Sequence, residues 1–261
     1  MRLKWFGTAT ILLEQDGMRL LFDPFLTINP GLFQPPVDEL SEAGHIFITH
    51  AHFDHLVDVP FIMKRSGGKT AVYGTAKPCE ILASKGVNGA HINQVAPGDA
   101  LSIGPFEINV LKGRHIVFDR RILIKTILNP RIMVNWSNFR YMLRESRTSD
   151  EAGETVVYHI RTAGRSVLLM GSLNLDDGTA YPTGADLLIL PYQGRSDVAD
   201  YAMPFIERLQ PKTILLDHFD DTFPPISSPV DTKPFLSLMR QNHPGIPVIC
   251  PRASAEWIEI F

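Results

Sequence analysis

A cluster of metal-binding side chains within six consecutive residues constrains this chain more than any other feature of its sequence. His50, His52, Asp54 and His55 directly follow the mostly apolar stretch 45–49, which we expect to be a buried strand. Side chains alternate between the two faces of a strand and wind around a helix, so neither element gathers all four at one point. The segment therefore predicts a tight loop that leaves a strand and converges on a metal ion.

The ligand types indicate which metal to expect. Imidazole and carboxylate together suit zinc, manganese or iron better than magnesium or calcium. We expect a divalent metal cofactor, zinc first and manganese or iron as alternatives, with one or two ions per chain. A chance surface cluster is the alternative, but it would have to sit at the end of a buried strand. Cys79 and Cys250 are far apart and form no CxxC pair, which argues against a thiolate site or a disulfide framework.

At 261 residues the chain is long enough for one large domain or two small ones, and we expect a single domain over 1–261. Its composition is ordinary for a soluble globular enzyme. Hydrophobic residues make up 44% and charged residues 20%, and the net charge of −3 gives no reason to expect nucleic acid as a partner. No apolar run reaches the ~20 residues that cross a bilayer, so we expect no transmembrane segment. Charged residues interrupt residues 1–22, so they lack the apolar core of a signal peptide. We expect a cytoplasmic protein that acts on a small-molecule substrate.

Periodicity and turn residues predict many short strands with helices between some of them. The expected helices are 56–65, 77–85, 198–209 and 231–242. The expected strands are 2–6, 9–14, 18–23, 45–49, 69–73, 91–95, 99–103, 105–112, 154–162, 166–170, 186–190, 212–216, 247–250 and 255–260. Hairpins and strand–helix units both occur, which argues for mixed sheets with helices outside rather than one doubly wound sheet.

A basic, apolar segment around residues 118–150 stands apart from this pattern. Its basic residues are Arg120, Arg121, Lys125, Arg131, Arg140, Arg144 and Arg147, and Arg114 lies just before the segment. Asn129-Pro130 divides it into two expected short helices. Three interpretations stay open: a cap that receives an anionic or acyl-bearing substrate, an interface that forms a homo-oligomer, or an amphipathic hairpin packed on the body.

Motifs in a fixed order give the chain a family resemblance. They are Trp5-Phe6-Gly7-Thr8-Ala9-Thr10, Leu21-Phe22-Asp23-Pro24, the His50–His55 cluster, His115 and Asp217-His218. The chain resembles the metallo-β-lactamase-fold hydrolases, and within them the branch with ascorbate-6-phosphate lactonase-like and N-acyl-phosphatidylethanolamine phospholipase D-like proteins. The resemblance covers nearly the whole chain except residues 118–150. It implies an α/β four-layer αββα sandwich with a helical insertion around 118–150.

The resemblance also implies roles for individual residues. His50, His52 and His115 would hold one metal, and Asp54, His55 and His218 a second. Three protein ligands leave an open position for water, which suits a catalytic metal. Asp54 would also be the catalytic residue that orients the attacking water. Asp23, Ser172 and Asp217 would lie behind the ligands, and Arg114 would contact the substrate.

One position departs from the family pattern. Ser172 follows Gly171 at a strand end, where these proteins normally carry an aspartate that bridges both metals. A neutral serine is a poor bridge between two cations. Three alternatives stay open: Asp176, Asp177 or Asp23 substitutes for the missing aspartate, the site holds one metal, or catalysis has been lost.

The expected function is metal-dependent hydrolysis. A metal-bound hydroxide would attack a lactone or other ester, or a phosphoester, in a small and anionic substrate. The enzyme would then be a lactonase or esterase, or a phosphodiesterase. The rival from another class is a degenerate metal- or ligand-binding protein of the same fold, and Ser172 is the residue that motivates it.

Overall fold

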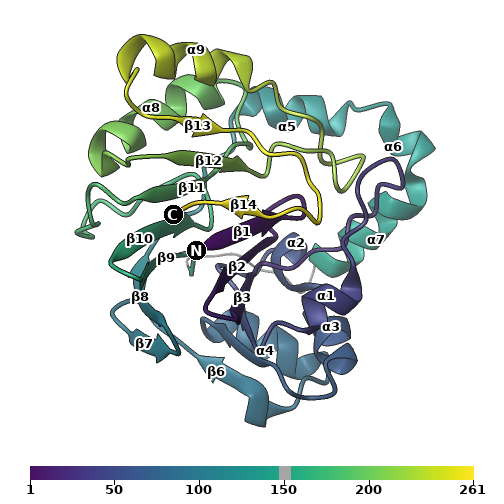
Figure 1. The fold of residues 1–261 in the computed structure, drawn as a ribbon. Helices are drawn as coiled ribbons and strands as arrows, with labels where there is room; N and C mark the ends of the chain where they lie inside the picture. Colours follow the sequence, from purple (N-terminus) through teal and green to yellow (C-terminus); the bar gives the residue numbers. More distant parts are fainter. Residues whose placement is uncertain (147–153) are drawn as a thin grey trace.

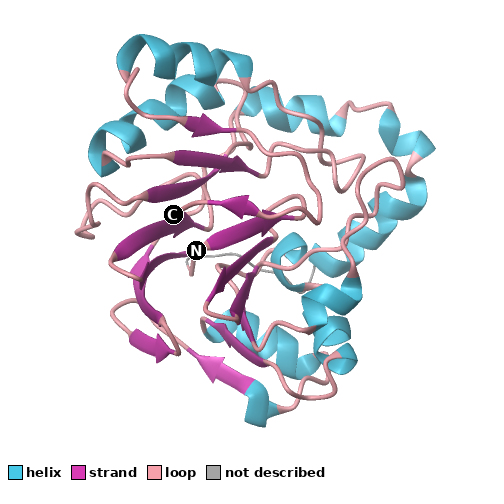
Figure 2. Cartoon of the chain, in the orientation of Figure 1, coloured by secondary structure: helices cyan, strands magenta, loops and turns pink. Residues whose placement is uncertain are grey.

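Two seven-stranded sheets lie face to face with helices on both outer sides (Figures 1 and 2). The computed structural model describes residues 1–146 and 154–261. The four-layer αββα sandwich predicted from the resemblance is therefore confirmed. Residues 147–150 of the expected insertion, Arg147 among them, lie outside the described residues.

Each sheet is antiparallel in one half and parallel in the other. The order in the first is β14 (Ile258–Glu259), β1 (Arg2–Trp5), β2 (Ile11–Gln15), β3 (Met18–Phe22), β4 (His45–Phe47), β5 (Ala71–Gly74) and β6 (Ile92–Gln94). The order in the second is β13 (Val248–Ile249), β12 (Ile214–Asp217), β11 (Leu187–Pro191), β10 (Arg165–Met170), β9 (Val156–Thr162), β8 (Phe106–Lys112) and β7 (Ala100–Ile103). Strands β3 to β6 are mutually parallel, and so are β10 to β13.

Helices cover the outer faces and connect the parallel strands, as such crossovers require. The first sheet carries α1 (Val37–Ser41), α2 (Phe53–Leu56), α3 (Val59–Arg65) and α4 (Ala76–Ser84), with a 3₁₀ turn at Gly89–His91. The second carries α8 (Val198–Leu209) and α9 (Lys233–Asn242). The insertion forms α5 (Arg120–Ile127), α6 (Arg131–Val134) and α7 (Trp136–Ser146) along one side of the molecule (Figure 1).

Successive side chains of a central strand point to opposite faces of its sheet, so each strand contributes both to the core between the sheets and to the core under the helices. In β10, Val167 and Leu169 point into the core between the sheets, whereas Leu168 and Met170 point into the core under the helices. Strands buried on both faces are apolar at almost every position. That is why the central strands read as apolar runs rather than as alternating patterns.

Two helical predictions need correction. The single helix expected over 56–65 is two helices, because the chain breaks between Leu56 and Val59. The insertion has three helices rather than two, because Asn135 leaves the helical region at φ −109° and ψ 37°. The short helix α1, which begins at Val37 directly after Pro36, was not among the predicted helices.

Strand direction brings the candidate site together. Strands β8, β10, β11 and β12 share one direction, so their carboxyl ends lie at one edge of the second sheet. Strands β3 and β4 end together in the first sheet. His50, His115 and His218 each follow the carboxyl end of one of these strands. None of the helices in the described part of the chain has the length and apolar character needed to cross a bilayer.

Candidate metal centre

The segment after β4 carries four of the six candidate ligands, and its backbone changes direction within it. Residues 48–52 leave the strand in non-helical conformation, and His52 is still extended (φ −66°, ψ 147°) where α2 begins at Phe53. His50 and His52 therefore lie on the extended part, while Asp54 and His55 lie on the helical turn. The change of conformation divides the four side chains between two groups.

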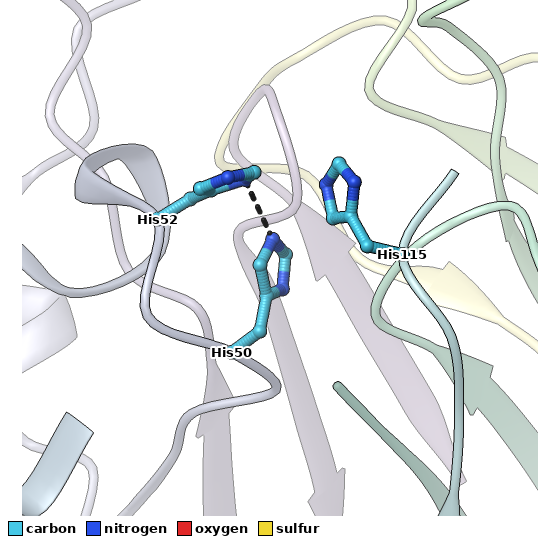
Figure 3. A group of neighbouring side chains, drawn as sticks. All are labelled: His50, His52 and His115. Atoms are coloured by element: carbon cyan, nitrogen blue, oxygen red, sulfur yellow. Dashed lines mark hydrogen bonds between the residues drawn. The ribbon is translucent and has the colours of Figure 1, made fainter. Parts of the chain in front are cut away.

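The first group contains His50, His52 and His115. Nε2 of His50 lies 3.0 Å from Nδ1 of His52, and the ring of His115 stands 4.5 Å from the ring of His52. Figure 3 shows the three imidazoles converging from the β4 loop and from the segment after β8. One ligand atom from each lies within 4.8 Å of the others, which is close enough to share one cation.

The second group contains Asp54, His55 and His218, and all three side chains are buried. Oδ2 of Asp54 lies 3.3 Å from Nε2 of His218 and 3.7 Å from Nε2 of His55. The structure thus brings together all six residues that the sequence nominated, in the two sets expected from the resemblance. Their service as ligands remains a prediction.

Hydrogen bonds behind the first group fix which nitrogen faces inward. The hydroxyl of Thr49 donates to Asp23, so at 3.0 Å it accepts from the Nδ1–H of His50. The Nδ1–H of His115 donates to the carbonyl oxygen of Ile116 at 2.9 Å. Nε2 is therefore the unprotonated nitrogen of both rings, and in His50 it accepts a hydrogen bond from Nδ1 of His52. Metal-binding histidines are typically oriented by such outer hydrogen bonds.

Asp23 plays the same part for the second group. Its Oδ2 lies 2.9 Å from Nδ1 of His55, and its Oδ1 accepts from the backbone N–H of Thr49 at 2.8 Å. One buried carboxylate thus positions the first residue of the ligand loop and one of its ligands. This placement agrees with the expected position of Asp23 behind the ligands.

Burial and neighbouring charge set the protonation states that metal binding needs. Burial, reinforced by the surrounding imidazoles, holds the pKa of His50 well below its ordinary value. Burial and His52 lower the pKa of His115 to about 4. Burial favours the neutral form of Asp54, but His55 and His218 outweigh it and hold the pKa of that carboxyl below its usual range. Burial alone would lower the pKa of His218, but the hydrogen bond and charge of Asp54 outweigh burial and raise it, so a cation bound there would displace a proton. The neutral imidazoles of the first group and the ionised carboxylate of the second are the ligand types that zinc, manganese or iron prefers.

Asp217 is buried next to His218 but belongs to neither group. Burial raises the pKa of Asp217 to about 8, and its Oδ1 has no hydrogen-bond partner among the described residues. A protonated, neutral Asp217 would not add a further negative charge behind the centre.

Ser172 acts on the loop of His115. Its hydroxyl accepts from the backbone N–H of Ile116 at 3.0 Å, and the side chain of Asn174 donates to the carbonyl of His115 at 3.1 Å. Gly171, just before it, lies so close to Thr49 that an added Cβ would stand 2.3 Å from the Cβ of Thr49. The end of β10 therefore packs directly against both ligand-bearing segments.

The carboxylates considered as substitutes for the missing bridge are held elsewhere. Asp176 is paired with Lys112 and Arg114, both at 3.3 Å. Asp177 is paired with Arg114 at 2.8 Å, and Asp23 holds Thr49 and His55. Among the described residues, neither group contains a carboxylate other than Asp54. The guanidinium of Arg114 is thus already paired with two carboxylates.

Sequence reasoning did not identify the contacts of the Gly7-Thr8 turn. The backbone N–H of Thr8 donates to Asp220 at 3.1 Å, and its carbonyl accepts from the backbone N–H of His218 at 2.9 Å. A Cβ at Gly7 would stand 2.8 Å from the Asp220 carboxylate. Thr8, Asp23 and His218 all have positive φ, at 48°, 43° and 62°. Such backbone is strained for a non-glycine residue, and strain of this kind is often found at functional sites. The other non-glycine residues with positive φ among the described residues, Asp16, Ala163 and Gln210, lie in turns and at a helix end.

The insertion is fixed beside the candidate centre. The ring of Phe118 lies 5.6 Å from the ring of His115. Arg131 is paired with Asp221, and the side chain of Asn129 donates to the carbonyl of Pro225 at 2.8 Å, both in the loop after His218. The segment therefore contacts the surroundings of both groups.

Comparisons with known proteins agree with this arrangement. A family model described as "Beta-lactamase superfamily domain" matches residues 18–219. The UPF0173 metal-dependent hydrolase of Carboxydothermus hydrogenoformans is 28% identical over 232 residues, which is 88% of this chain and 89% of that protein. The relative of the same description from Methylocella silvestris is 32% identical over 115 residues, which is 44% of this chain and only about half of that protein, 48%.

Solved structures show the same architecture. The metallo-beta-lactamase fold protein YhfI from Bacillus subtilis superposes with a TM-score of 0.65 at 16% identity, covering 96% of both chains. Igni18, a metallo hydrolase from Ignicoccus hospitalis, superposes with a TM-score of 0.63 at 18% identity, covering 99% of this chain and 98% of that one. The narrower branch named above stays a prediction. Because the family model spans most of the chain and the fold agrees, the chain belongs to the beta-lactamase superfamily and has the metallo-β-lactamase fold.

Proposed function

We propose that this chain is a metal-dependent hydrolase whose centre is formed by His50, His52 and His115 together with Asp54, His55 and His218. The observation that carries the proposal is the convergence of the two triads from both sheets, with Nε2 of His50 and His115 left unprotonated by outer hydrogen bonds and directed toward the first group. The relatives described as metal-dependent hydrolases support it.

A bound divalent cation would supply two things: it lowers the pKa of water toward ~7, and it stabilises negative charge on a substrate oxygen. The remaining work falls to the chain. Asp54 is ionised at neutral pH and is the residue that we assign to orient water and accept its proton. Thr49 and Asp23 hold the imidazoles in position, and burial excludes bulk water from the second group.

The two groups differ in a way that favours unequal metal binding. Asp54, His55 and His218 are buried and include a carboxylate, whereas His52 and His115 are partly exposed and their group is uncharged. With Ser172 turned toward Ile116, no described carboxylate joins the groups. We therefore assign one firmly held ion to the Asp54 group and the substrate-facing side to the histidine group.

The substrate class that we propose is a small ester, such as a lactone, or a phosphoester. Both reactions place negative charge on an oxygen in the transition state, which a metal centre stabilises. Basic side chains at Arg120 and Arg121 follow closely after Phe118, which contacts His115, and they favour an anionic substrate. We also propose that the protein works in the cytoplasm.

A second candidate function rests on Ser172 alone. Because this hydroxyl is committed to the His115 loop, the centre lacks the second negative charge of the family pattern. A protein of this kind could bind a metal and a ligand without turnover.

The deciding experiment is a hydrolysis screen of γ- and δ-lactones, aryl esters and a bis-aryl phosphodiester, with protein loaded in turn with zinc, manganese and ferrous iron. His50→Ala and His218→Ala should abolish any turnover, whereas His91→Gln, a change in a 3₁₀ turn outside both groups, should retain it. Stoichiometric metal binding without turnover of any substrate class would favour the binding protein over the hydrolase.

A further inference from the structure

The helical segment 117–146 exposes an unusual amount of apolar surface for its length. The exposed large apolar side chains of the described residues fall mostly here: Val117, Phe118, Leu123, Ile124, Ile127, Leu128, Met133, Val134, Trp136 and Leu143. In the rest of the described chain, only Phe61 and Ile226 belong to that class. Contiguous exposed apolar surface of this kind marks an interaction site.

The most exposed of these side chains gather at one corner, between α5 and α6. Ile127 and Leu128 are 73% and 74% exposed, and Met133 and Val134 are 85% and 87% exposed. The corner is not a loose end, because Asn129 and Arg131 inside it are bonded to the loop after His218. A rigid apolar projection is thus presented to whatever lies outside.

The same segment carries cations without acidic partners. The segment has six basic residues against two acidic ones, Asp119 and Glu145, in a chain whose net charge is −3. Asp119 caps α5 and bonds to Ser196, and Glu145 is paired with Lys85 and Arg144. Among the described residues, none of the four remaining cations has an ion-pair partner: Arg120, Arg121, Lys125 and Arg140.

The charge decides which occupant fits the apolar corner. In a two-fold interface the same patch faces itself, so a second copy would bring these cations against their own equivalents. An anionic lipid surface offers the complementary arrangement, with acyl boundary for the apolar side chains and acidic headgroups for the cations. Trp136, 54% exposed at the start of α7, is the residue type that prefers this boundary.

We propose that segment 117–146 docks this protein on the surface of a membrane that contains anionic lipid, with the α5–α6 corner inserted. The protein then lies on the bilayer rather than across it. Because Phe118 connects the docking segment to His115, docking brings the histidine group close to the lipid surface.

The first test is co-flotation with vesicles of phosphatidylcholine alone and of phosphatidylcholine with one-third phosphatidylglycerol. We expect binding to the anionic vesicles only. The combined Ile127→Ser, Met133→Ser and Val134→Ser variant should lower the partition coefficient at least about tenfold, because its apolar insertion is lost. Phe61→Ser, a change at an apolar residue of α3 that is 53% exposed, should bind like the parent. All these side chains are exposed, and an unchanged unfolding temperature shows that the fold is retained.

The charge contribution is tested separately. Arg121→Gln with Lys125→Gln should lower the partition coefficient by roughly fivefold for each charge. Arg240→Gln on α9 removes an exposed cation from outside the segment and should have no such effect. Trp136 provides an optical readout, because Trp5 is buried and Trp257 is covered by Arg2 and Lys4. Anionic vesicles should blue-shift its emission, and Trp136→Phe should remove the shift.

Three results would overturn the proposal: no binding to either vesicle, equal binding to both, or binding that the serine variant retains. Sedimentation velocity tests the other occupant considered for the corner, which is a second copy of this chain. A dimer that dissociates in the serine variant and does not bind vesicles would assign the corner to a second copy of this chain.

Discussion

Asp23 and His55 form a buried pair in which the carboxylate Oδ2 lies 2.9 Å from Nδ1 of the imidazole. The same carboxylate also bonds to Thr49, whose hydroxyl in turn accepts from His50. One residue at the end of β3 therefore orients one candidate ligand directly and another through Thr49.

The first prediction follows from this pair. Asp23→Asn keeps the shape but removes the charge that holds the His55 Nδ1–H, and it should weaken metal binding by about 10- to 100-fold. Competition titration with a chromophoric zinc chelator measures the change. Asp38→Asn, at a carboxylate that is 76% exposed, is the control and should bind zinc like the parent. Equal affinity of Asp23→Asn and parent would remove Asp23 from the centre.

The second prediction concerns metal stoichiometry. We expect about one firmly bound ion per chain, because Ser172 supplies no bridging charge. Ser172→Asp should raise the count to about two, since an aspartate there adds the missing anionic ligand. Ser172→Asn is the matched control, with nearly the same volume and no charge. Elemental analysis of protein purified without added metal or chelator gives the counts. Two ions in the parent would show that both groups bind a metal without a bridging carboxylate.

The third prediction concerns metal removal. A ligand that binds only the folded chain stabilises it by about 2.7 kcal/mol at one hundred times its dissociation constant. Chelation should therefore lower the unfolding temperature by several degrees, and restored zinc should reverse the loss. The paired His50→Ala and His218→Ala variant should show no response to chelator. A parent protein whose unfolding temperature ignores the chelator would contradict metal binding in the folded state.

The fourth prediction concerns Gly171 and Thr49. Gly171→Ala places a methyl group 2.3 Å from the Cβ of Thr49, so either β10 or the ligand loop must shift. We expect a loss of about 1–3 kcal/mol in the free energy of unfolding, together with weaker metal binding. Gly245→Ala, where an added Cβ meets nothing within 4 Å, is the control. Denaturant unfolding measures both, and equal stability of the two variants would refute the close contact.

The fifth prediction uses Asp186, far from the centre. Burial would raise the pKa of this carboxyl, but bonds from Lys212, Ser166 and Arg165 outweigh burial and lower the pKa to about 2. The pKa of Asp186 is lower in the folded chain than in the unfolded chain, where it is near 3.8. The ionised carboxylate therefore stabilises the fold fully above pH 3.8, and this stabilisation is lost as the pH falls through about 2. Asp186→Asn should therefore cost about 1 kcal/mol at pH 7 and progressively less from pH 5 to pH 2. Urea unfolding across this range checks the trend, with Asp38→Asn expected to cost little at any pH.

The parts of the fold that the sequence revealed are those set by local pattern. Strand ends and the order of motifs placed His50, His115 and His218 at carboxyl ends of strands, and equal strand direction then brings such ends together. Local pattern does not predict which ring nitrogen of His50 or His115 faces the other ligands; the hydrogen bonds of the structure do.

Long-range contacts were the part that could not be predicted. The hydrogen bond from Thr8 to Asp220 joins residues that are 212 apart in sequence. The hydroxyl of Ser172, after β10, accepts from the backbone of Ile116, after β8, and β9 lies between these two strands. The sequence around Thr8 or Ser172 contains no pattern that indicates the residue to which it is bonded. The division of the insertion at Asn135 was missed for a related reason, since a single non-helical residue leaves the surrounding helical pattern intact.

Each triad takes two members from the loop after β4 and its third from the opposite sheet, and this has a consequence for how the chain is made. As synthesis proceeds from the N-terminus, the loop after β4 emerges with only two candidate ligands of each set. His115 completes the first set when less than half of the chain exists, whereas the second set waits for His218, near the end. The firmly held ion that we assign to the Asp54 group is therefore captured late, after the strand that carries His218 has joined the second sheet.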